Sequence, residues 1–496
     1  MGDDIKITNG FIIEADEEFS GIRSFLEKSI TEIDPVLSGA TGLPGQGAFP
    51  ISLRKDQSLS ERDESYIIDI SEKGIIISSA TEKGCFYGVQ TLRQLISVDN
   101  GYLSISYVRI YDYPDFSWRA YLLDEARYFF GMEFVKGLLE ELASMKFNKL
   151  HWHLTDDAGW RVEIKEYPRL TSVGAFRNDT QVGGWGSKER SGNPHGGYYS
   201  QDEIREIIEF ASALQIDIIP EIEMPGHASA AIAAYPWIGI IGELTEVPAE
   251  FGKLPDSYNI ADPAVVEFLQ HVLDEIAELF PYEVIHIGGD EVLFEAWAES
   301  ADMQSYIKDH DLLSPADAQI HFTNHISNYL NGRGKRMMGW NEILGDNLHG
   351  FDENNYITGG ATLSRDAIVH FWKGDIELLT RAAESGYHIV NSLHSETYLD
   401  YTYNSLPLKR FYGFEPVPAD LDEKYHEYII GIGTQMWTEW TPTYKDVEYQ
   451  TFPRVAAIAE IGWSGRRDYD DFLKRLLIMA ENWKRKGINF PFEQIK

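Results

Sequence analysis

Eight short β-like runs that alternate with helical stretches constrain the fold of this chain more than any other feature. They begin after about residue 115, and stretches with helical periodicity separate several of them. Two of those stretches open with start signals, namely Ser200 with Glu203 three residues later, and Asp262 before Pro263. Eight βα units over roughly 380 residues predict a (β/α)₈ barrel with long loop insertions. The runs are WRAYLLDEA, NKLHWHLTDD, DIIPEIEM, VIHIGGDE, RMMGWNE, AIVHFW, HIVNSLH and YIIGIGTQMWTE.

The residues before the barrel predict a separate, smaller α/β domain. The stretch YIIDISEKGIIISS favours two strands around a turn, and FYGVQTLRQLI favours a helix with an apolar stripe through Val89 and Leu92. The segment YDYPDF, with Pro114, is a plausible boundary. We therefore expect an α/β domain over residues 1–114 and a barrel domain over residues 115–496.

Charge and composition exclude several classes of partner. The chain has 79 acidic against 43 basic residues, a formal net charge of −36 that repels nucleic acid and anionic membranes. No uncharged apolar run reaches the ~18 residues that a membrane span needs. The opening MGDDIKITNG has no signal-peptide pattern, which leaves the compartment open. Cys85 is the only cysteine, so an intrachain disulfide and a cysteine metal cluster are excluded.

Most of the eight runs end in polar or aromatic groups. The carboxyl ends of barrel strands form the active-site face, so these groups indicate a site. Tryptophan ends three runs, and an exposed tryptophan is costly unless something covers it, which favours an aromatic-walled pocket for one sugar ring. For any single tryptophan, core filling is an equally good interpretation. The strand-end residues are Arg127, Asp156, His227, Asp290, Glu291, Trp340, Trp372, Tyr398, Asp400, Trp437 and Glu439.

The stretch VIHIGGDEV, residues 284–292, delivers two adjacent carboxylates. Alternation points Asp290 into the barrel mouth, and Glu291 can join it only if the strand breaks its pleat. Gly288 and Gly289 supply that freedom. Adjacent carboxylates in an apolar pocket hinder each other's ionisation, and a protonated carboxyl beside an ionised one is typical of glycoside cleavage. Arg127 suits hydrogen bonds to sugar hydroxyls, or equally a structural ion pair.

His151 and His153 raise the alternative of a metal-dependent amidohydrolase. Two histidines at i and i+2 on a strand face the same way, as metal ligands would. The sequence supplies no obvious further histidine pair and no bridging lysine. We therefore expect these rings to pack and hydrogen-bond inside the barrel, and we expect no metal.

Four motifs together resemble glycoside hydrolase family 20, the β-N-acetylhexosaminidases: HIGGDE, HWHLTDD, EIEMPGH and MWTE. The stretch GCFYGVQTLRQL is similar to the end of the small domain that precedes the barrel in that family. The resemblance implies substrate-assisted catalysis, in which the 2-acetamido oxygen of the substrate is the nucleophile. It implies that Glu291 is the general acid and base, that Asp290 orients the acetamido N–H, and that Tyr398 hydrogen-bonds the acetamido oxygen. It implies no metal and no organic cofactor.

The resemblance implies binding roles for the other strand-end residues. Three aromatic residues would wall the acetamido pocket, three charged residues would hold the hydroxyls of the terminal sugar, and a pair would support the acid. In that order they are Trp340, Trp372 and Trp437; Arg127, Asp400 and Glu439; and Asp156 with His227.

Two positions depart from the family pattern. Tyr128 stands where the family often has histidine, and we expect it to change only supporting contacts. Phe414, in YGFEP, stands where many members have tryptophan, and we expect weaker stacking at that subsite. The preference among leaving groups is therefore open.

The sequence thus predicts an exo-acting, retaining β-N-acetylhexosaminidase that removes terminal β-linked N-acetylglucosamine or N-acetylgalactosamine from glycans. One alternative is a relative that releases disaccharides, but Arg127, Asp400 and Glu439 would close the pocket around a single ring. Another is a catalytically silent glycan-binding barrel, which would not need both Asp290 and Glu291. The natural glycan and the oligomeric state are not indicated.

Overall fold

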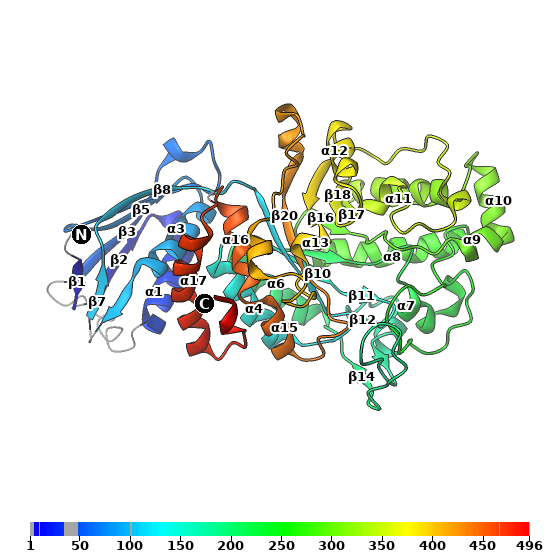
Figure 1. Ribbon diagram of the computed structural model, residues 1–496, viewed down its shortest axis with the longest axis horizontal. Helices are drawn as coiled ribbons and strands as arrows, with labels where there is room; N and C mark the ends of the chain where they lie inside the picture. The colour runs from blue at the N-terminus through cyan, green and yellow to red at the C-terminus, as the bar shows by residue number, and fades with distance from the viewer. Residues whose placement is uncertain (1–3, 9, 34–47, 100–101, 466, 496) are drawn as a thin grey trace.

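A closed barrel of eight parallel strands forms the centre of the molecule (Figure 1). The computed structural model describes residues 4–8, 10–33, 48–99, 102–465 and 467–495. Each predicted run supplies one barrel strand, so the predicted (β/α)₈ fold is confirmed. The strands are β9 (Trp118–Asp124), β10 (Lys149–His153), β15 (Asp217–Glu221), β16 (Val284–His286), β17 (Arg336–Trp340), β18 (Ile368–Phe371), β19 (His388–Asn391) and β20 (Ile429–Met436).

Helices surround the barrel, and the predicted start signals are in place. Ser200 and Glu203 form a capping box, and Asp262 caps the helix that has Pro263 at its first position. The outer helices include α4 (Met132–Ser144), α6 (Gln201–Ala213), α8 (Pro263–Leu279), α11 (Pro315–Asn331), α12 (Ile376–Glu384) and α16 (Arg454–Trp463).

One βα unit departs from the regular pattern. The connection from β17 to β18, which the structure describes throughout, holds only two 3₁₀ helices, η4 (Asn341–Leu344) and η5 (Glu353–Tyr356). A loop therefore replaces the fifth outer helix. This loop carries side chains into the barrel mouth, as described below.

The amino-terminal residues fold into a five-stranded sheet in the order β2, β3, β5, β4, β8. The predicted strand pair and helix are β4 (Tyr66–Ser71), β5 (Gly74–Ser79) and α3 (Glu82–Leu95), in which Val89 and Leu92 are buried. Helix α1 (Ser20–Ile33) packs beside α3 on the sheet (Figure 1). The other strands are β2 (Phe11–Ala15), β3 (Phe49–Lys55) and β8 (Val108–Asp112), and a separate sheet pairs β1 (Ile5–Ile7), β7 (Tyr102–Ile105) and β6 (Ser97–Asp99).

The small domain meets the barrel at the amino-terminal ends of its strands. Glu64 forms an ion pair with Arg119 at the start of β9, with 2.7 Å between Oε2 and Nη1, and accepts a hydrogen bond from Asn148 just before β10. Lys146 donates to the hydroxyl of Tyr66 at 2.8 Å. The carboxyl ends of the strands, where barrel enzymes carry their chemistry, therefore lie on the opposite side from this contact.

Two layers of side chains fill the barrel below the ring of Trp340. The lowest is apolar, and the next is polar and lies below the mouth: it contains His151, Glu221, His286 and His370, all at most 2% exposed. Trp340 closes this layer from above by stacking on His370, with ring centroids 4.1 Å apart. The apolar layer consists of Trp118, Ala120, Ile219, Val284, Met338, Ile368 and Val390.

No helix within the described ranges is both long and apolar enough to cross a membrane. The expectation for the amino-terminal segment falls partly on residues 1–3 and 9, which lie outside the described residues. Cys85 is buried in α3, where burial raises the pKa of its thiol.

Candidate active site

The predicted strand-end residues meet at the carboxyl ends of the barrel strands, and every strand contributes. Each lies on the last residue of a strand or within nine residues after it. Contacts between neighbouring strands connect them into one pocket. In strand order from β9 to β20, the residues are Arg127, Asp156, His227, Asp290 with Glu291, Trp340, Trp372, Tyr398 with Asp400, and Trp437 with Glu439.

The glycine pair before the two acids acts as the predicted hinge. Strand β16 ends at His286, so regular alternation does not extend to Asp290. Gly288 and Gly289 have φ of +68° and +92°, and Glu291 itself has φ of +54°. A side chain at position 288 would also collide with the carboxylate of Glu223, since a Cβ there would lie 1.7 Å from Oε2. The broken pleat lets both acids face the mouth, at the cost of a strained backbone at Glu291.

Asp290 is the acid of the pair whose pKa the environment raises. Burial is the main cause, with smaller contributions from Glu342 and Glu291, and together they raise the pKa of Asp290 to about 8 against the opposing effect of His227. A raised pKa at the pair is as predicted, but the predicted cause, mutual repulsion of adjacent carboxylates, ranks below burial. His227 Nε2 lies 3.7 Å from Asp290 Oδ2 and 3.8 Å from Glu291 Oε2, so it faces both acids.

His227 is held from behind by two consecutive acids. Its Nδ1 lies 3.0 Å from Asp157 Oδ2, within hydrogen-bonding distance, and 3.5 Å from Asp156 Oδ2. The expected Asp156–His227 pair is therefore a triad in which Asp157 makes the shorter contact. Burial would lower the pKa of His227, but Asp156, Asp157 and Asp290 outweigh it and raise the pKa well above its usual value. His227 is thus an imidazolium that faces both Asp290 and Glu291.

The position of Arg127 is compatible with both predicted roles, a structural ion pair and hydrogen bonds to sugar hydroxyls. Its guanidinium lies 2.7 Å from Asp156 Oδ2, 3.3 Å from Asp124 Oδ2 and 3.7 Å from Glu439 Oε1, so it is a buried ion-pair centre. It also lies over the ring of Trp437, 5.3 Å from the centroid, and therefore borders the pocket.

Two carboxylates of the site carry buried oxygens without a protein partner. Among the residues that the structure describes, Oδ1 of Asp290 and Oδ1 of Asp400 accept no hydrogen bond. Burial, followed by repulsion from Glu439, raises the pKa of Asp400 to about 8. Buried polar atoms are nearly always paired in folded proteins, so these two oxygens, like both carboxylate oxygens of the buried Glu223, are available to hydrogen-bond donors of a ligand.

Four aromatic side chains form a cage between the two carboxylates. Trp437 lies 5.8 Å from Trp340 and 6.2 Å from Tyr398, measured between ring centroids. Trp372 stacks on Tyr398 at 6.1 Å with 12° between the ring planes. The indole N–H groups of Trp340 and Trp372 donate to Glu221 and Glu342, at 2.8 and 2.9 Å, which fixes both rings. Small apolar groups with one polar edge, such as an acetamide, suit this cage.

The polar layer under the cage holds more histidine than the sequence indicated. His286 and His370 join His151, and one ligand atom from each lies within 4.8 Å of the others. His286 and His370 lie singly on two different strands, β16 and β18, so neither run supplies a second histidine pair like that of β10. Both ring nitrogens of His370 already have partners: Nδ1 lies 3.3 Å from His286 Nε2, and Nε2 lies 2.8 Å from the Ser392 hydroxyl.

Glu221 organises the rest of that layer. It lies 3.1 Å from His151, 2.9 Å from His286 and 2.5 Å from His153, whose other nitrogen contacts Asp156 at 3.1 Å. Burial would lower the pKa of His153, but Glu221 and Asp156 raise it to about 10. His153 between the two carboxylates is part of a buried network of histidines and acids.

The structure locates both residues that depart from the family pattern. Phe414 is 2% exposed and packs in the main hydrophobic core, so its ring is not free to stack on a bound sugar, and weaker stacking at that subsite stays a prediction. Tyr128 is buried against Phe251 and His195 beside the site, at centroid distances of 6.1 and 5.0 Å. It contacts neighbouring side chains, as a supporting residue would.

Sequence reasoning missed the residues that loops bring to the mouth. Lys253 comes from the β15–α8 connection and His349 from the β17–β18 loop, and both approach Oε1 of Glu291, at 3.3 and 3.7 Å. Neither lies in a periodic run or a strand end. The sequence held one signal of this kind, and it concerned two other residues, Lys373 and Glu342, which lie close in sequence to predicted site residues. Lys373 directly follows Trp372, and Glu342 lies two residues after Trp340.

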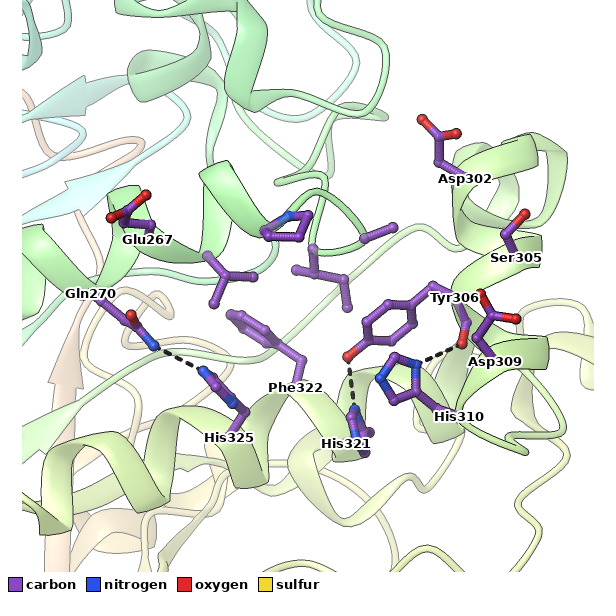
Figure 2. A pocket seen from close by; sticks show the side chains of 14 residues that line it. Glu267, Gln270, Asp302, Ser305, Tyr306, Asp309, His310, His321, Phe322 and His325 are labelled. Carbon is purple, nitrogen blue, oxygen red and sulfur yellow. Dashed lines mark hydrogen bonds between the residues drawn. The ribbon is translucent and has the colours of Figure 1, made fainter.

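A separate groove lies on the outer helices, away from the strand ends. It has a volume of about 680 Å³ and is bordered by α8, α11 and α10 (Ala301–Asp309). Figure 2 shows its polar side chains bonded to one another, with His325 to Gln270 and His321 to Tyr306. None of the predicted site residues lines it, so it is distinct from the candidate active site.

A closed parallel barrel with an aromatic cage and paired carboxylates at its carboxyl ends is typical of a glycoside hydrolase. Two family models agree with this class: "Glycosyl hydrolase family 20, catalytic domain" matches residues 116–466, and "Glycosyl hydrolase family 20, domain 2" matches residues 2–113. The chain belongs to glycosyl hydrolase family 20.

Relatives with curated names and solved structures agree with this assignment. The chain is 33% identical to a β-hexosaminidase of Porphyromonas gingivalis over 88% of its own length but spans only 55% of that protein. It is 31% identical to a β-N-acetylhexosaminidase of Cellulomonas fimi, with 90% of this chain and 84% of the relative covered. The crystal structure of a family 20 exo-β-N-acetylglucosaminidase from Vibrio harveyi, in complex with N-acetylglucosamine, aligns with a TM-score of 0.84 and 31% identity over 99% of this chain and 76% of that one.

Proposed function

We propose that this protein is an exo-acting β-N-acetylhexosaminidase that releases one terminal N-acetylhexosamine by a retaining, substrate-assisted reaction. The observation that carries the proposal is the placement of Asp290 and Glu291 on a glycine hinge beside a cage of four aromatic rings. The cage fits an N-acetyl group, and the unpaired oxygen of Asp290 is an acceptor for its N–H. The relatives named above support the same reaction class.

In the first step, the acetamido oxygen of the substrate attacks C1 while Glu291 gives its proton to the leaving oxygen. The C1–O bond breaks, and the acetamido group becomes a cyclic oxazolinium ion. Asp290 accepts the N–H hydrogen bond and stabilises the positive charge that develops on nitrogen. Tyr398 donates to the acetamido oxygen and holds it against C1, which supplies a high effective concentration of nucleophile.

In the second step, Glu291 takes a proton from water, and the water oxygen attacks C1 from the face that the leaving group occupied. The oxazolinium ring opens and leaves the sugar as its β-hemiacetal, so the configuration at C1 is retained. His227, charged and 3.8 Å from Glu291 Oε2, supports the carboxylate that Glu291 becomes between the two steps. Asp156 positions His227 together with Asp157.

The remaining strand-end residues bind the sugar in this proposal. Asp400 and Glu439 accept hydrogen bonds from hydroxyl groups, and Arg127 donates to one. Trp340, Trp372 and Trp437 enclose the acetamido methyl group. Because these side chains close around one ring, the proposal is for release of a single sugar rather than a disaccharide.

Two further points belong to the same proposal. No metal takes part, since the nitrogens of His153 and His370 already have protein partners. The chain divides near residue 114, between β8, which ends at Asp112, and β9, which begins at Trp118. The two family models, which meet between residues 113 and 116, support this division.

The test is a panel of 4-nitrophenyl β-glycosides that share one leaving group and differ only at C2 and C4. We expect turnover of the 2-acetamido-glucoside or 2-acetamido-galactoside and negligible turnover of the plain glucoside. The C4 pair reports gluco against galacto preference, which depends on how Asp400 and Glu439 meet O4. Brisk hydrolysis of the plain glucoside would contradict the proposal, because that substrate lacks the internal nucleophile.

A further inference from the structure

The outer side of Glu291 carries two lysines, in a protein whose formal net charge is −36. Lys253 Nζ lies 3.3 Å from Glu291 Oε1 and 2.8 Å from His349 Nδ1. Lys373 Nζ lies 3.0 Å from the same His349 nitrogen. We call Lys253, Lys373 and His349 the lysine cluster. It lies on the oxygen of Glu291 opposite the one that faces His227.

The two ammonium groups share an acceptor that can satisfy only one of them. His349 Nε2 lies 3.1 Å from Glu342 Oε1, within hydrogen-bonding distance, so Nδ1 has a single lone pair to offer. Two lysines directed at one lone pair repel each other. Burial, followed by the charge of Lys253, lowers the pKa of Lys373. One of the two ammonium groups is therefore left without the His349 acceptor and can donate to a ligand.

The carboxylates nearby do not balance the two charges during catalysis. Within the described part of the chain, Glu291 is the one carboxylate within 4.0 Å of Lys253, and Lys373 has none. Both oxygens of Glu342 are taken, one by His349 and the other by Trp372. When Glu291 holds the proton that it gives to the leaving oxygen, Lys253 has no anionic partner.

The position of the cluster identifies which part of a substrate would meet it. In the proposed function the acetamido group of the terminal sugar occupies the cage, whose Trp340 is 1% exposed, and Glu291 faces the bond to be cleaved. Exposure rises outward, from 19% for the Glu291 side chain to 30% for that of Lys253. The cluster thus borders the leaving group. Lys253 is steadied over the ring of Phe351, 4.7 Å from its centroid, rather than free in solvent.

From this geometry we propose that Lys253 and Lys373 form a subsite for an oxyanion on the leaving group, a carboxylate or a sulfate ester. The substrate class is then an N-acetylhexosaminide linked to an acidic sugar. This inference rests on the function proposed above and specifies its substrate. An anion on the leaving sugar takes Lys253 away from Glu291, so the acid is left facing the glycosidic oxygen.

The test compares three disaccharides in which N-acetylglucosamine is β-linked to glucose, to glucuronic acid or to glucose 6-sulfate. The readout is kcat/KM for each charged disaccharide divided by that for the neutral one. We expect the wild-type ratio to favour at least one charged substrate, and Lys253→Met and Lys373→Met each to lower that ratio about tenfold, the size of a charge-assisted hydrogen bond in a partly exposed site. Added salt should lower the wild-type ratio, and a preference for the uronate or for the sulfate identifies the anion.

Lys308→Met, at a lysine on α10 far from the barrel mouth, is the matched control and should leave the ratio unchanged. A wild-type ratio near one, or ratios in the two lysine variants equal to that of wild type, would overturn the subsite. Failure of the proposed function gives a different result, since wild type would then cleave neither the neutral disaccharide nor an aryl N-acetylglucosaminide.

Discussion

The hinge at Gly288 makes a prediction whose size follows from the structure. Replacing Gly288 by alanine imposes two penalties. A non-glycine residue at φ of +68° costs about 1 to 2 kcal/mol. The new Cβ would also lie 1.7 Å from Glu223 Oε2, and overpacking a buried site costs about 1 to 3 kcal/mol. Gly288→Ala should therefore lower the free energy of unfolding by about 2 to 5 kcal/mol.

A matched control separates the two penalties. Gly334 has φ of +71°, and a Cβ there would meet nothing within 4 Å, so Gly334→Ala carries the backbone strain alone. We expect it to cost about 1 to 2 kcal/mol. In a double-mutant cycle, the cost of Gly288→Ala should fall to a similar value when Glu223→Ala is already present, because the obstacle is gone.

The assay follows urea unfolding by tryptophan fluorescence and measures kcat on an aryl N-acetylglucosaminide in the folded range. Gly288→Ala should also lose activity about 100-fold, since a displacement of about 1 Å in the hinge misdirects Asp290 and Glu291. Gly334→Ala should keep normal activity. If the two alanine variants behave alike in stability and in turnover, the hinge does not position the acids, and this reasoning fails.

Three further predictions concern charge and metal. Glu291→Gln should lower turnover by about 10² to 10⁴ on substrates with poor leaving groups, and near-normal activity on oligosaccharides would remove Glu291 from its role. Because burial raises the folded-state pKa of Asp290 to about 8 from a usual 3.8, the folded chain keeps a proton that the unfolded chain releases between those values, so stability falls as pH rises through that window. Asp290→Asn should remove up to about 1.4 kcal/mol per pH unit of that decline, and parallel urea-midpoint curves for variant and wild type from pH 5 to pH 8 would contradict the assignment. Thorough chelation should leave turnover unchanged, whereas a loss restored by a divalent ion would indicate a metal at His151, His286 and His370.

The barrel could be predicted because each of its strands corresponds to a local sequence pattern. Each run is short and carries apolar residues, helical stretches separate several of the runs, and in a barrel the end of such a run marks the active-site face. The residues that follow from that rule, from Arg127 to Glu439, all reach the mouth. Asp290 and Glu291 were the clearest candidate site residues, since the two glycines before them indicated a break in the strand.

What the sequence could not predict depends on contacts between distant segments. His151, His286 and His370 lie on three strands, and only barrel closure brings their rings into one layer. Lys253 and His349 come from long loops, whose paths have no periodic signal. The main cause of the raised pKa of Asp290 also could not be predicted, because the adjacency of two acids in the sequence does not show that Asp290 is buried.

The central claim is that the substrate's own acetamido oxygen attacks C1 while Asp290 holds its N–H. The most direct measurement is kcat/KM for a series of aryl glycosides with one leaving group, in which the N-acetyl methyl carries zero, one, two or three fluorines. Fluorine withdraws electron density from the carbonyl oxygen, so the proposed mechanism predicts a steep, progressive fall in rate across the series. A rate that stays level, together with a sugar covalently attached to Asp290 after reaction with a 2-fluoro glycoside, would show that the protein supplies the nucleophile and would contradict the mechanism.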